Sequence, residues 1–161
     1  MMDKKYNLIL TIVFFLIILS LISAFIIEYG LGHEPCKLCI YQRYPYFISI
    51  LLLTSIFVLK KNIKIHLIVL SIVSLLGAII AFYHFGIEQG FFDESVVCET
   101  KKLNQILSKE DLLKQLKQNT ISCKKVTFRL LGLSLASINT IFSLVLSYIF
   151  FLIFKKYEND K

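Results

Sequence analysis

The chain has 161 residues, of which 57% are hydrophobic and 18% charged, and its mean hydropathy is +0.72. A soluble domain of this length carries a charged fraction nearer to a quarter, so the composition argues against a soluble globular protein. The net charge of +7 could suggest binding to nucleic acid, but the lysines have a topological explanation and we expect no nucleic-acid partner.

Four stretches of the chain contain no Asp, Glu, Lys or Arg, and they are 22, 16, 23 and 25 residues long. They are Tyr6–Ile27, Tyr44–Leu59, Ile65–Ile87 and Leu130–Phe154. About 20 apolar residues in a helix cross a hydrocarbon layer of roughly 30 Å, so three of the stretches qualify directly. The second is lengthened by Arg43 and Lys60, whose long side chains can reach the interface. Because lipid offers no water to the backbone, each span should be helical.

We therefore predict an all-α membrane protein, a single domain over residues 1–161 made of a four-transmembrane-helix bundle. The expected spans are approximately 7–27, 44–60, 65–86 and 131–154, with outer loops 28–43 and 87–130. The first span begins like a signal peptide, with Lys4 and Lys5 ahead of it and Ala24 as a cleavage residue. Its apolar run continues past Ala24, which favours an uncleaved helix.

The lysines set the predicted orientation. If four helices alternate, one side of the membrane receives Lys4, Lys5, Lys60, Lys61, Lys64, Lys155, Lys156 and Lys161. The short loop on the other side holds only Lys37 and Arg43. Basic short loops stay in the cytoplasm, so both termini of this multi-pass protein are predicted to be cytoplasmic.

The long second outer loop contains a further helical pattern. Ser108 followed by Asp111 is typical of a helix start, and leucines then recur among lysines up to residue 117. This pattern predicts a short interfacial helix that lies on the outer membrane surface. An ordinary amphipathic helix packed on top of the bundle would have the same pattern.

All four cysteines fall in the two predicted outer loops. Cys36 and Cys39 form a Cys-x-x-Cys, and Cys98 and Cys123 lie in the long loop. Outside the cytoplasm cysteines can be oxidised and remain so, and an even number fits pairing. Four cysteines allow three connectivities, and pairing within the Cys-x-x-Cys leaves Cys98 with Cys123.

Two structural explanations compete with redox chemistry. A disulfide between Cys98 and Cys123 would close a long loop, but one between Cys36 and Cys39 closes a ring too small to constrain the unfolded chain much. A zinc site would favour a second close cysteine pair or a nearby pair of histidines, so no metal is expected. Cys-x-x-Cys is the usual spacing of redox-active thiols, and we therefore favour thiol–disulfide chemistry.

Two polar residues near the outer ends of the spans are candidates for a cofactor site. If a helix begins near Leu38, Arg43 shares a face with Cys39 and would stabilise its thiolate, although Arg43 could also be only an interfacial anchor. His84 lies near the outer end of the third span, and it could equally be a histidine bonded to a neighbouring helix. The sequence has no dinucleotide, flavin or haem pattern, so we expect a lipid-soluble quinone, ubiquinone or menaquinone, as the electron acceptor.

Three segments carry a resemblance to a known family. They are Glu34–Arg43 with its Cys-x-x-Cys-Ile-Tyr-Gln-Arg, Tyr83–Gly90 at the exit of the third span, and Leu131–Ala136 followed by Asn139. With the two loop cysteines between the second and third segments, the chain resembles the disulfide bond formation protein B (DsbB) family over nearly its whole length.

The resemblance implies that the protein lies in a bacterial inner membrane with its cysteines on the periplasmic side. It further implies that the protein oxidises a periplasmic thioredoxin-like (DsbA-like) dithiol oxidase and passes the electrons to the quinone pool of the membrane. It implies that Cys98 is attacked by the partner and that Cys123 is its resolving mate. Cys36 would then receive electrons from the loop pair, and Cys39 would face the quinone.

The same resemblance places Arg43 at the quinone head group and carries His84 over from the third-span segment. Two other classes of protein remain in competition. One is a non-catalytic membrane protein with structural disulfides. The other is a quinone-linked reductase of the vitamin K epoxide reductase type, which has a four-helix bundle and a Cys-x-x-Cys but lacks the sequence context of Glu34–Arg43.

Overall fold

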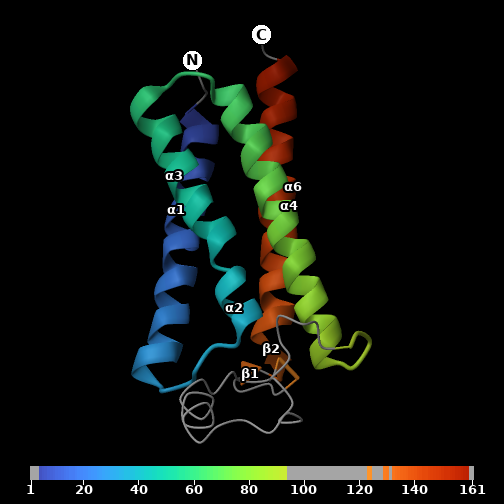
Figure 1. Cartoon of the computed structure of the whole chain (residues 1–161). Helices are drawn as coiled ribbons and strands as arrows, with labels where there is room; N and C mark the ends of the chain where they lie inside the picture. Colours follow the sequence, from blue (N-terminus) through green and yellow to red (C-terminus); the bar gives the residue numbers. More distant parts are fainter. Residues whose placement is uncertain (1–3, 94–122, 125–128, 131, 160–161) are drawn as a thin grey trace, which may run out of the picture.

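The computed structural model describes residues 4–93, 123–124, 129–130 and 132–159. Over these residues the chain is mostly helical (Figure 1). Its elements are α1 (Lys4–Phe25), the π-helical turn η1 (Ile26–Gly30), α2 (Lys37–Tyr41), α3 (Tyr44–Leu59), α4 (Ile63–Glu88), β1 (Arg129–Leu130), β2 (Leu133–Ser134) and α6 (Leu135–Asn159).

Four helical segments in the described part of the chain are long and apolar enough to cross a membrane. They are Lys4–Gly30, Lys37–Leu59, Ile63–Glu88 and Leu135–Asn159. The prediction of an all-α four-helix membrane bundle is therefore confirmed. The boundaries differ from the charge-free stretches most at the second span, which begins at Lys37 and thus includes Cys39, and at the fourth, which begins at Leu135.

The second span is interrupted near its start, and Pro45 explains why. Proline has no N–H, and its ring clashes with the carbonyl four residues earlier, which here belongs to Tyr41, the last residue of α2. The chain tightens at this point, with the N–H of Arg43 donating to the carbonyl of Ile40 at 3.0 Å. The turn at residues 42–43 points Gln42 into the core, where it is buried.

Helices α4 and α6 form the closest pair in the bundle because small side chains line their contact. Ser71 of α4 and Ser147 of α6 exchange hydrogen bonds, each hydroxyl donating to the other's backbone carbonyl at 3.1 and 2.9 Å. Nearer the middle, Gly77 lies against Pro45 of α3, and a Cβ at Gly77 would stand 3.2 Å from the proline ring. Small residues with polar contacts are a common means of bringing membrane helices together.

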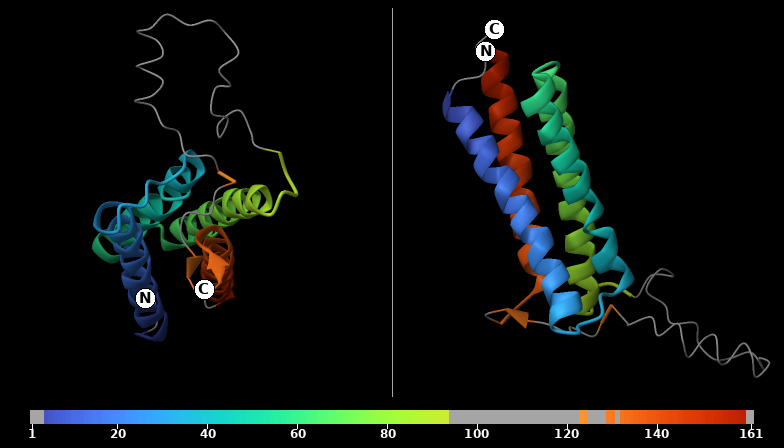
Figure 2. Two further views of the ribbon diagram at one scale, coloured as in Figure 1. Left: turned by 90° about the horizontal axis from the view of Figure 1, so that it is seen from below. Right: turned by 90° about the vertical axis from the view of Figure 1, so that its left-hand side faces the viewer.

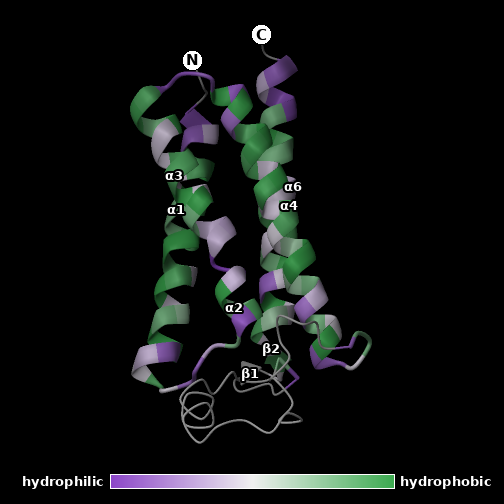
Figure 3. Cartoon of the chain, viewed as in Figure 1, coloured by the Kyte–Doolittle hydropathy of each residue, from purple (hydrophilic) through white to green (hydrophobic). Residues whose placement is uncertain are grey.

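The apolar core lies between all four long helices. It contains Leu10, Val13, Ile17, Leu21, Tyr46, Leu53, Ile56, Leu67, Leu70, Leu146, Phe150 and Ile153. The outward faces are apolar as well, with Phe15, Leu51 and Val58 among many large side chains that are more than half exposed. In water such an apolar surface would promote aggregation, whereas in a membrane it faces the hydrocarbon of the lipids. Figures 2 and 3 show the long helices side by side, with polar residues gathered toward the two ends of the bundle.

The two termini lie at the same end of the bundle as the α3–α4 connection (Figure 1). Lys64 of α4 and Glu158 of α6 form an ion pair of 2.5 Å there. This arrangement agrees with an even number of crossings, and the cytoplasmic location of that end stays a prediction. At the opposite end, β1 and β2 pair as a two-residue antiparallel hairpin through Gly132, whose φ of +84° favours glycine, directly before α6.

Candidate active site

The Cys-x-x-Cys lies at the start of α2, at the end of the bundle away from the termini. Cys36 precedes the first helical residue with an extended backbone (φ −69°, ψ 165°), and its Sγ accepts a hydrogen bond from the backbone N–H of Cys39 at 3.3 Å. This is the position of a helix N-cap, which here is a sulfur. Both cysteines are free, and their Sγ atoms lie 2.8 Å apart. The two thiols are therefore placed to form and break a bond with each other.

In the reduced pair the negative charge belongs on Cys36, which lies just outside the second span. A hydrogen bond from the Cys39 thiol lowers the pKa of Cys36 to about 5, against the opposing effect of burial, and His84 adds to the lowering. From the sequence we predict a stabilised thiolate at Cys39 beside Arg43. The structure corrects this, because the sulfur next to the imidazole and receiving the hydrogen bonds is that of Cys36.

His84 reaches the thiol pair from α4. Its Nε2 lies 3.5 Å from Cys36 Sγ and 3.6 Å from a carboxylate oxygen of Glu88, one helical turn further along α4. His84 is 3% exposed. The sequence indicates this histidine as a possible quinone ligand, and the structure brings it against Cys36. A contact with quinone stays a prediction.

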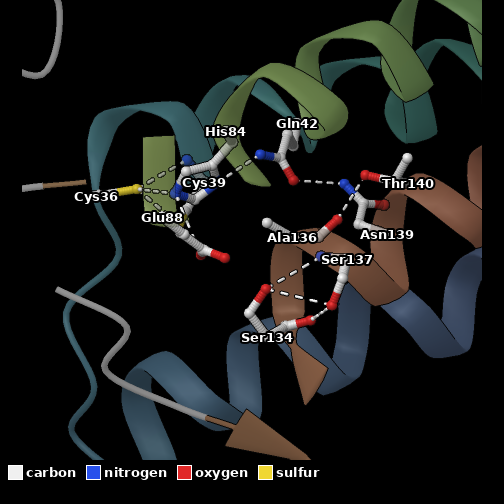
Figure 4. A network of polar contacts seen from close by, with 10 residues as sticks. All are labelled: Cys36, Cys39, Gln42, His84, Glu88, Ser134, Ala136, Ser137, Asn139 and Thr140. Carbon is white, nitrogen blue, oxygen red and sulfur yellow. Dashed lines mark hydrogen bonds and ion pairs between the residues drawn. The ribbon is translucent and has the colours of Figure 1, made fainter. Parts of the chain in front are cut away.

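A chain of buried polar side chains continues from His84 into the bundle (Figure 4). His84 Nδ1 lies 2.8 Å from the side-chain nitrogen of Gln42, and Asn139 Nδ2 of α6 donates to Gln42 Oε1 at 2.6 Å. The hydroxyl of Tyr46 donates to Asn139 Oδ1 and also lies 3.1 Å from Ser143 Oγ. Three helices thus contribute to one connected network that ends on the redox site.

Arg43 faces a different neighbour from the one expected. Its guanidinium forms a 2.5 Å ion pair with Glu28 of η1 and lies 5.0 Å from the ring centre of Phe25 in α1. The continuous helix that would align Arg43 with Cys39 is broken by the turn before α3. Arg43 therefore ties the second span to the first, and its predicted contact with a quinone head group is not tested by this geometry.

Of the two loop cysteines, Cys123 is described and Cys98 lies outside the described residues. Cys123 forms a disulfide, is 1% exposed, and packs in one cluster with Cys36, Leu38 and Ile87. The loop thus places one of its cysteines next to the Cys-x-x-Cys. The predicted interfacial helix near residues 108–117 also lies outside the described residues.

After α4 the chain folds back onto the last turns of that helix. The N–H of Phe91 donates to the carbonyl of Gly86 at 2.8 Å, and the ring of Phe92 stacks on Tyr83 with centres 5.6 Å apart. A Cβ at Gly86 would overlap the Phe92 ring, so only glycine permits this close approach.

An apolar groove of about 500 Å³ opens between α2–α3 and α4. It is lined by Leu38, Tyr41, Tyr44, Pro45, Ile48, Val73, Leu76, Ile79, Ile80 and Tyr83. Two lining residues, Leu38 and Tyr83, directly precede Cys39 and His84 in the chain. Its walls are aromatic and aliphatic, which suits an apolar ligand.

Cys36, Cys39 and His84 place three potential metal-ligand atoms within 4.8 Å of one another. Thiolates in a tetrahedral zinc site, with bonds of roughly 2.3 Å, stand about 3.8 Å apart. The separation of 2.8 Å between the two sulfurs is much shorter. The spacing therefore fits a pair of reacting thiols better than a metal centre.

A free thiol pair at a helix start, with Cys36 buried beside an imidazole inside a membrane bundle, defines a membrane thiol–disulfide oxidoreductase. The sequence matches the model of a family described as "Disulfide bond formation protein DsbB" over residues 6–153, so the chain belongs to this family and the resemblance drawn from Glu34–Arg43 is confirmed. Family membership makes the protein a disulfide-forming enzyme of the membrane.

One relative among curated proteins is the uncharacterized protein RP370 of Rickettsia prowazekii (strain Madrid E). The two are 28% identical over 144 residues, which cover 88% of this chain and 84% of the relative. No solved structure matches the chain.

The sequence by itself indicates no role for Gln42, Glu88 or Asn139, although all three stand in or beside the segments that carry the resemblance. A signal was available for Asn139, because an amide in a charge-free span must find a partner inside the bundle. The ion pair between Arg43 and Glu28 gave no comparable signal, since it joins two residues 15 positions apart across an irregular loop.

Proposed function

We propose that the protein oxidises the dithiol of a periplasmic thioredoxin-like partner and delivers the two electrons and two protons to a membrane quinone. The net reaction converts the partner's dithiol to a disulfide and the quinone to a quinol. When bound, the quinone supplies a two-electron acceptor that is soluble in the bilayer. The four cysteines, and the residues that hold them in place, carry out the thiol–disulfide exchange steps.

The observation that carries the proposal is the position of Cys36. It is buried against Cys123 of the second outer loop, while the turn of α2 that bears Cys39 borders the apolar groove. On one side, the Cys36–Cys39 pair contacts a cysteine from a loop that a soluble protein can approach. On its other side, the pair borders an apolar groove that is open toward lipid. This supports a relay in which electrons enter at the loop and leave at the membrane.

The exchange steps are written as thiolate attacks on disulfide sulfur. The partner's first thiolate attacks Cys98, which breaks the Cys98–Cys123 bond and frees Cys123. Cys123 attacks Cys36 and breaks the Cys36–Cys39 bond, and Cys39 leaves and takes up a proton. The partner's second thiol then closes the partner's disulfide and frees Cys98.

Cys98 completes the cycle by attacking Cys123 and expelling Cys36, so that the loop disulfide is restored and both electrons rest on the Cys-x-x-Cys. A thiol of lower pKa leaves faster. The hydrogen bond from the Cys39 thiol, which lowers the pKa of Cys36 to about 5, makes Cys36 a good leaving group in this last step.

The serial order can be tested by trapping. In a Cys123→Ser variant, a partner that lacks its own second cysteine should accumulate as a mixed disulfide on Cys98. Non-reducing electrophoresis would show the adduct as a band that reductant abolishes. The matched control adds Cys98→Ser, which should remove the band. An adduct that survives loss of Cys98 but requires Cys36 would mean that the partner addresses the Cys-x-x-Cys directly.

The route to the acceptor can be tested by filling the groove. Ile80 lines the groove on α4, whereas Ile72 of the same helix is about half exposed and lies outside the lining. Ile80→Trp should raise the quinone concentration that gives half-maximal oxidation of partner thiols, and Ile72→Trp should not. Equal values in the two variants would remove the groove from the electron path.

A further inference from the structure

The buried chain Gln42–Asn139–Tyr46, which the reaction scheme above does not use, has a consistent direction. Each amide has one donating and one accepting end, so the orientation of one side chain dictates that of the next. The Tyr46 hydroxyl donates to Asn139 Oδ1, which leaves Asn139 Nδ2 to donate to Gln42 Oε1. Gln42 then has only its nitrogen to offer to the next group, the imidazole of His84.

The imidazole meets opposite chemistry at its two nitrogens. On one side, the Gln42 side-chain nitrogen lies 2.8 Å from His84 Nδ1 and is a donor only, so Nδ1 must accept. On the other side, His84 Nε2 faces Cys36 Sγ at 3.5 Å and Glu88 Oε1 at 3.6 Å, both of which are acceptors when ionised. Both environments require the same neutral tautomer, with the proton on Nε2.

We propose that Gln42 and Asn139 are positioning residues that hold His84 as its neutral Nε2–H tautomer, so that the ring donates a hydrogen bond to the Cys36 sulfur. Neither residue touches the reacting sulfurs in the described structure. They act through His84, and Asn139 acts only through Gln42.

The network disfavours the other neutral tautomer of His84, in which the proton is on Nδ1. A proton on His84 Nδ1 would face the Gln42 amide nitrogen, donor against donor. Relief would require Gln42 to turn over, then Asn139, and then the Tyr46 hydroxyl to release its bond. Such a concerted reversal of a buried network is costly, because any partial reversal leaves two donors or two acceptors in contact.

The titratable groups that face His84 are two thiols and one carboxylate. Cys36 and Cys39 approach from α2 and Glu88 from α4, and the backbone of Cys123 also bonds to the ring. A donating Nε2–H would stabilise the Cys36 thiolate through a hydrogen bond to its sulfur. The inference rests on the proposed function only in taking Cys36 as a redox thiol, and it does not involve the quinone or the partner.

The experiment is ¹⁵N NMR of the histidine rings in the purified, reduced protein in detergent, without quinone or partner. The sequence has only three histidines, His33, His66 and His84, so a His84→Ala variant identifies the signals. We expect His84 to show an unprotonated Nδ1 and a protonated Nε2. A protonated Nδ1 in the unmodified protein would overturn the proposal.

Two isosteric variants test whether the network sets the tautomer of His84. Asn139→Asp replaces the donor to Gln42 with an acceptor, so Gln42 should turn over and His84 should lose the signal of an unprotonated Nδ1, although residue 139 does not contact the ring. Gln42→Glu should cause the same loss directly. The matched control is Ser137→Ala, two residues from Asn139 and bonded instead to Ser134, which should leave the ring unchanged.

An unchanged His84 ring in a folded Asn139→Asp variant would show that the network does not set the tautomer, and would overturn the proposal. Folding is checked by the dispersion of the remaining histidine signals. The result is separable from the proposed function, because partner oxidation with quinone is measured independently. Loss of that activity with an intact tautomer would count against the reaction scheme alone.

Discussion

Replacing Cys39 by alanine should raise the pKa of the reduced Cys36 thiol. The largest cause of the lowered pKa, which is about 5, is the hydrogen bond that Cys39 donates across the 2.8 Å between the sulfurs. A hydrogen bond to a charged group contributes about 1.5–3 kcal/mol. At about 1.4 kcal/mol per pKa unit, its loss should raise the pKa of Cys36 by about one to two units. His84 and the backbone N–H of residue 39 remain, so the value should stay below that of an ordinary cysteine.

The sign of the pH dependence follows from the thiolate being the reactive form. Reactivity of Cys36 is present above its pKa and is lost as the pH falls through that value. In the unmodified pair the loss occurs near pH 5. In the alanine variant the loss should already occur about one to two pH units higher.

The assay is the rate of alkylation of Cys36 by iodoacetamide as a function of pH, followed by mass spectrometry. Cys98 and Cys123 are replaced by serine so that only the Cys-x-x-Cys reports. Cys39→Ser is the matched control, because its hydroxyl can still donate and should retain much of the effect. An unchanged midpoint in Cys39→Ala, or the same shift in both variants, would refute the assignment of the charge to Cys36.

Three further predictions concern the topology, Arg43 and the contact of Phe92 with Gly86 at the end of α4. A membrane-impermeant thiol reagent applied to reduced intact spheroplasts should label Cys36 or Cys98; labelling only after the inner membrane is broken would contradict a periplasmic site. Arg43→Ala should raise the quinone concentration for half-maximal activity, with partial rescue by Arg43→Lys. If Glu28→Gln, which breaks the same ion pair, had an equal effect, Arg43 would act only by tying the first two spans together. Gly86→Ala should displace the Phe92 ring and lower the thermal midpoint by several degrees, measured against Gly30→Ala, where a Cβ meets only ordinary contacts.

Much of the architecture follows from the sequence alone. In lipid the backbone must satisfy its own hydrogen bonds, so charge-free stretches of sufficient length have to be helices, and four of them make a bundle with both termini at one end. The Cys-x-x-Cys was likewise visible as a redox motif, because its spacing fits redox chemistry better than a structural disulfide. These features depend on composition and local spacing, which the sequence states directly.

The site itself was decided by tertiary contacts. Pro45 interrupts the second span just after Arg43, so the assumption of one continuous helix misplaced the arginine, whose partner is Glu28. His84, which adds to the lowering of the pKa of Cys36, contacts that sulfur across 48 positions of the chain. Asn139 lies 97 positions from Gln42, yet one hydrogen bond of 2.6 Å joins them. Hydrogen bonds act over about 3 Å, and their partners are set by how the helices pack, a relation that spacing along a single sequence does not encode.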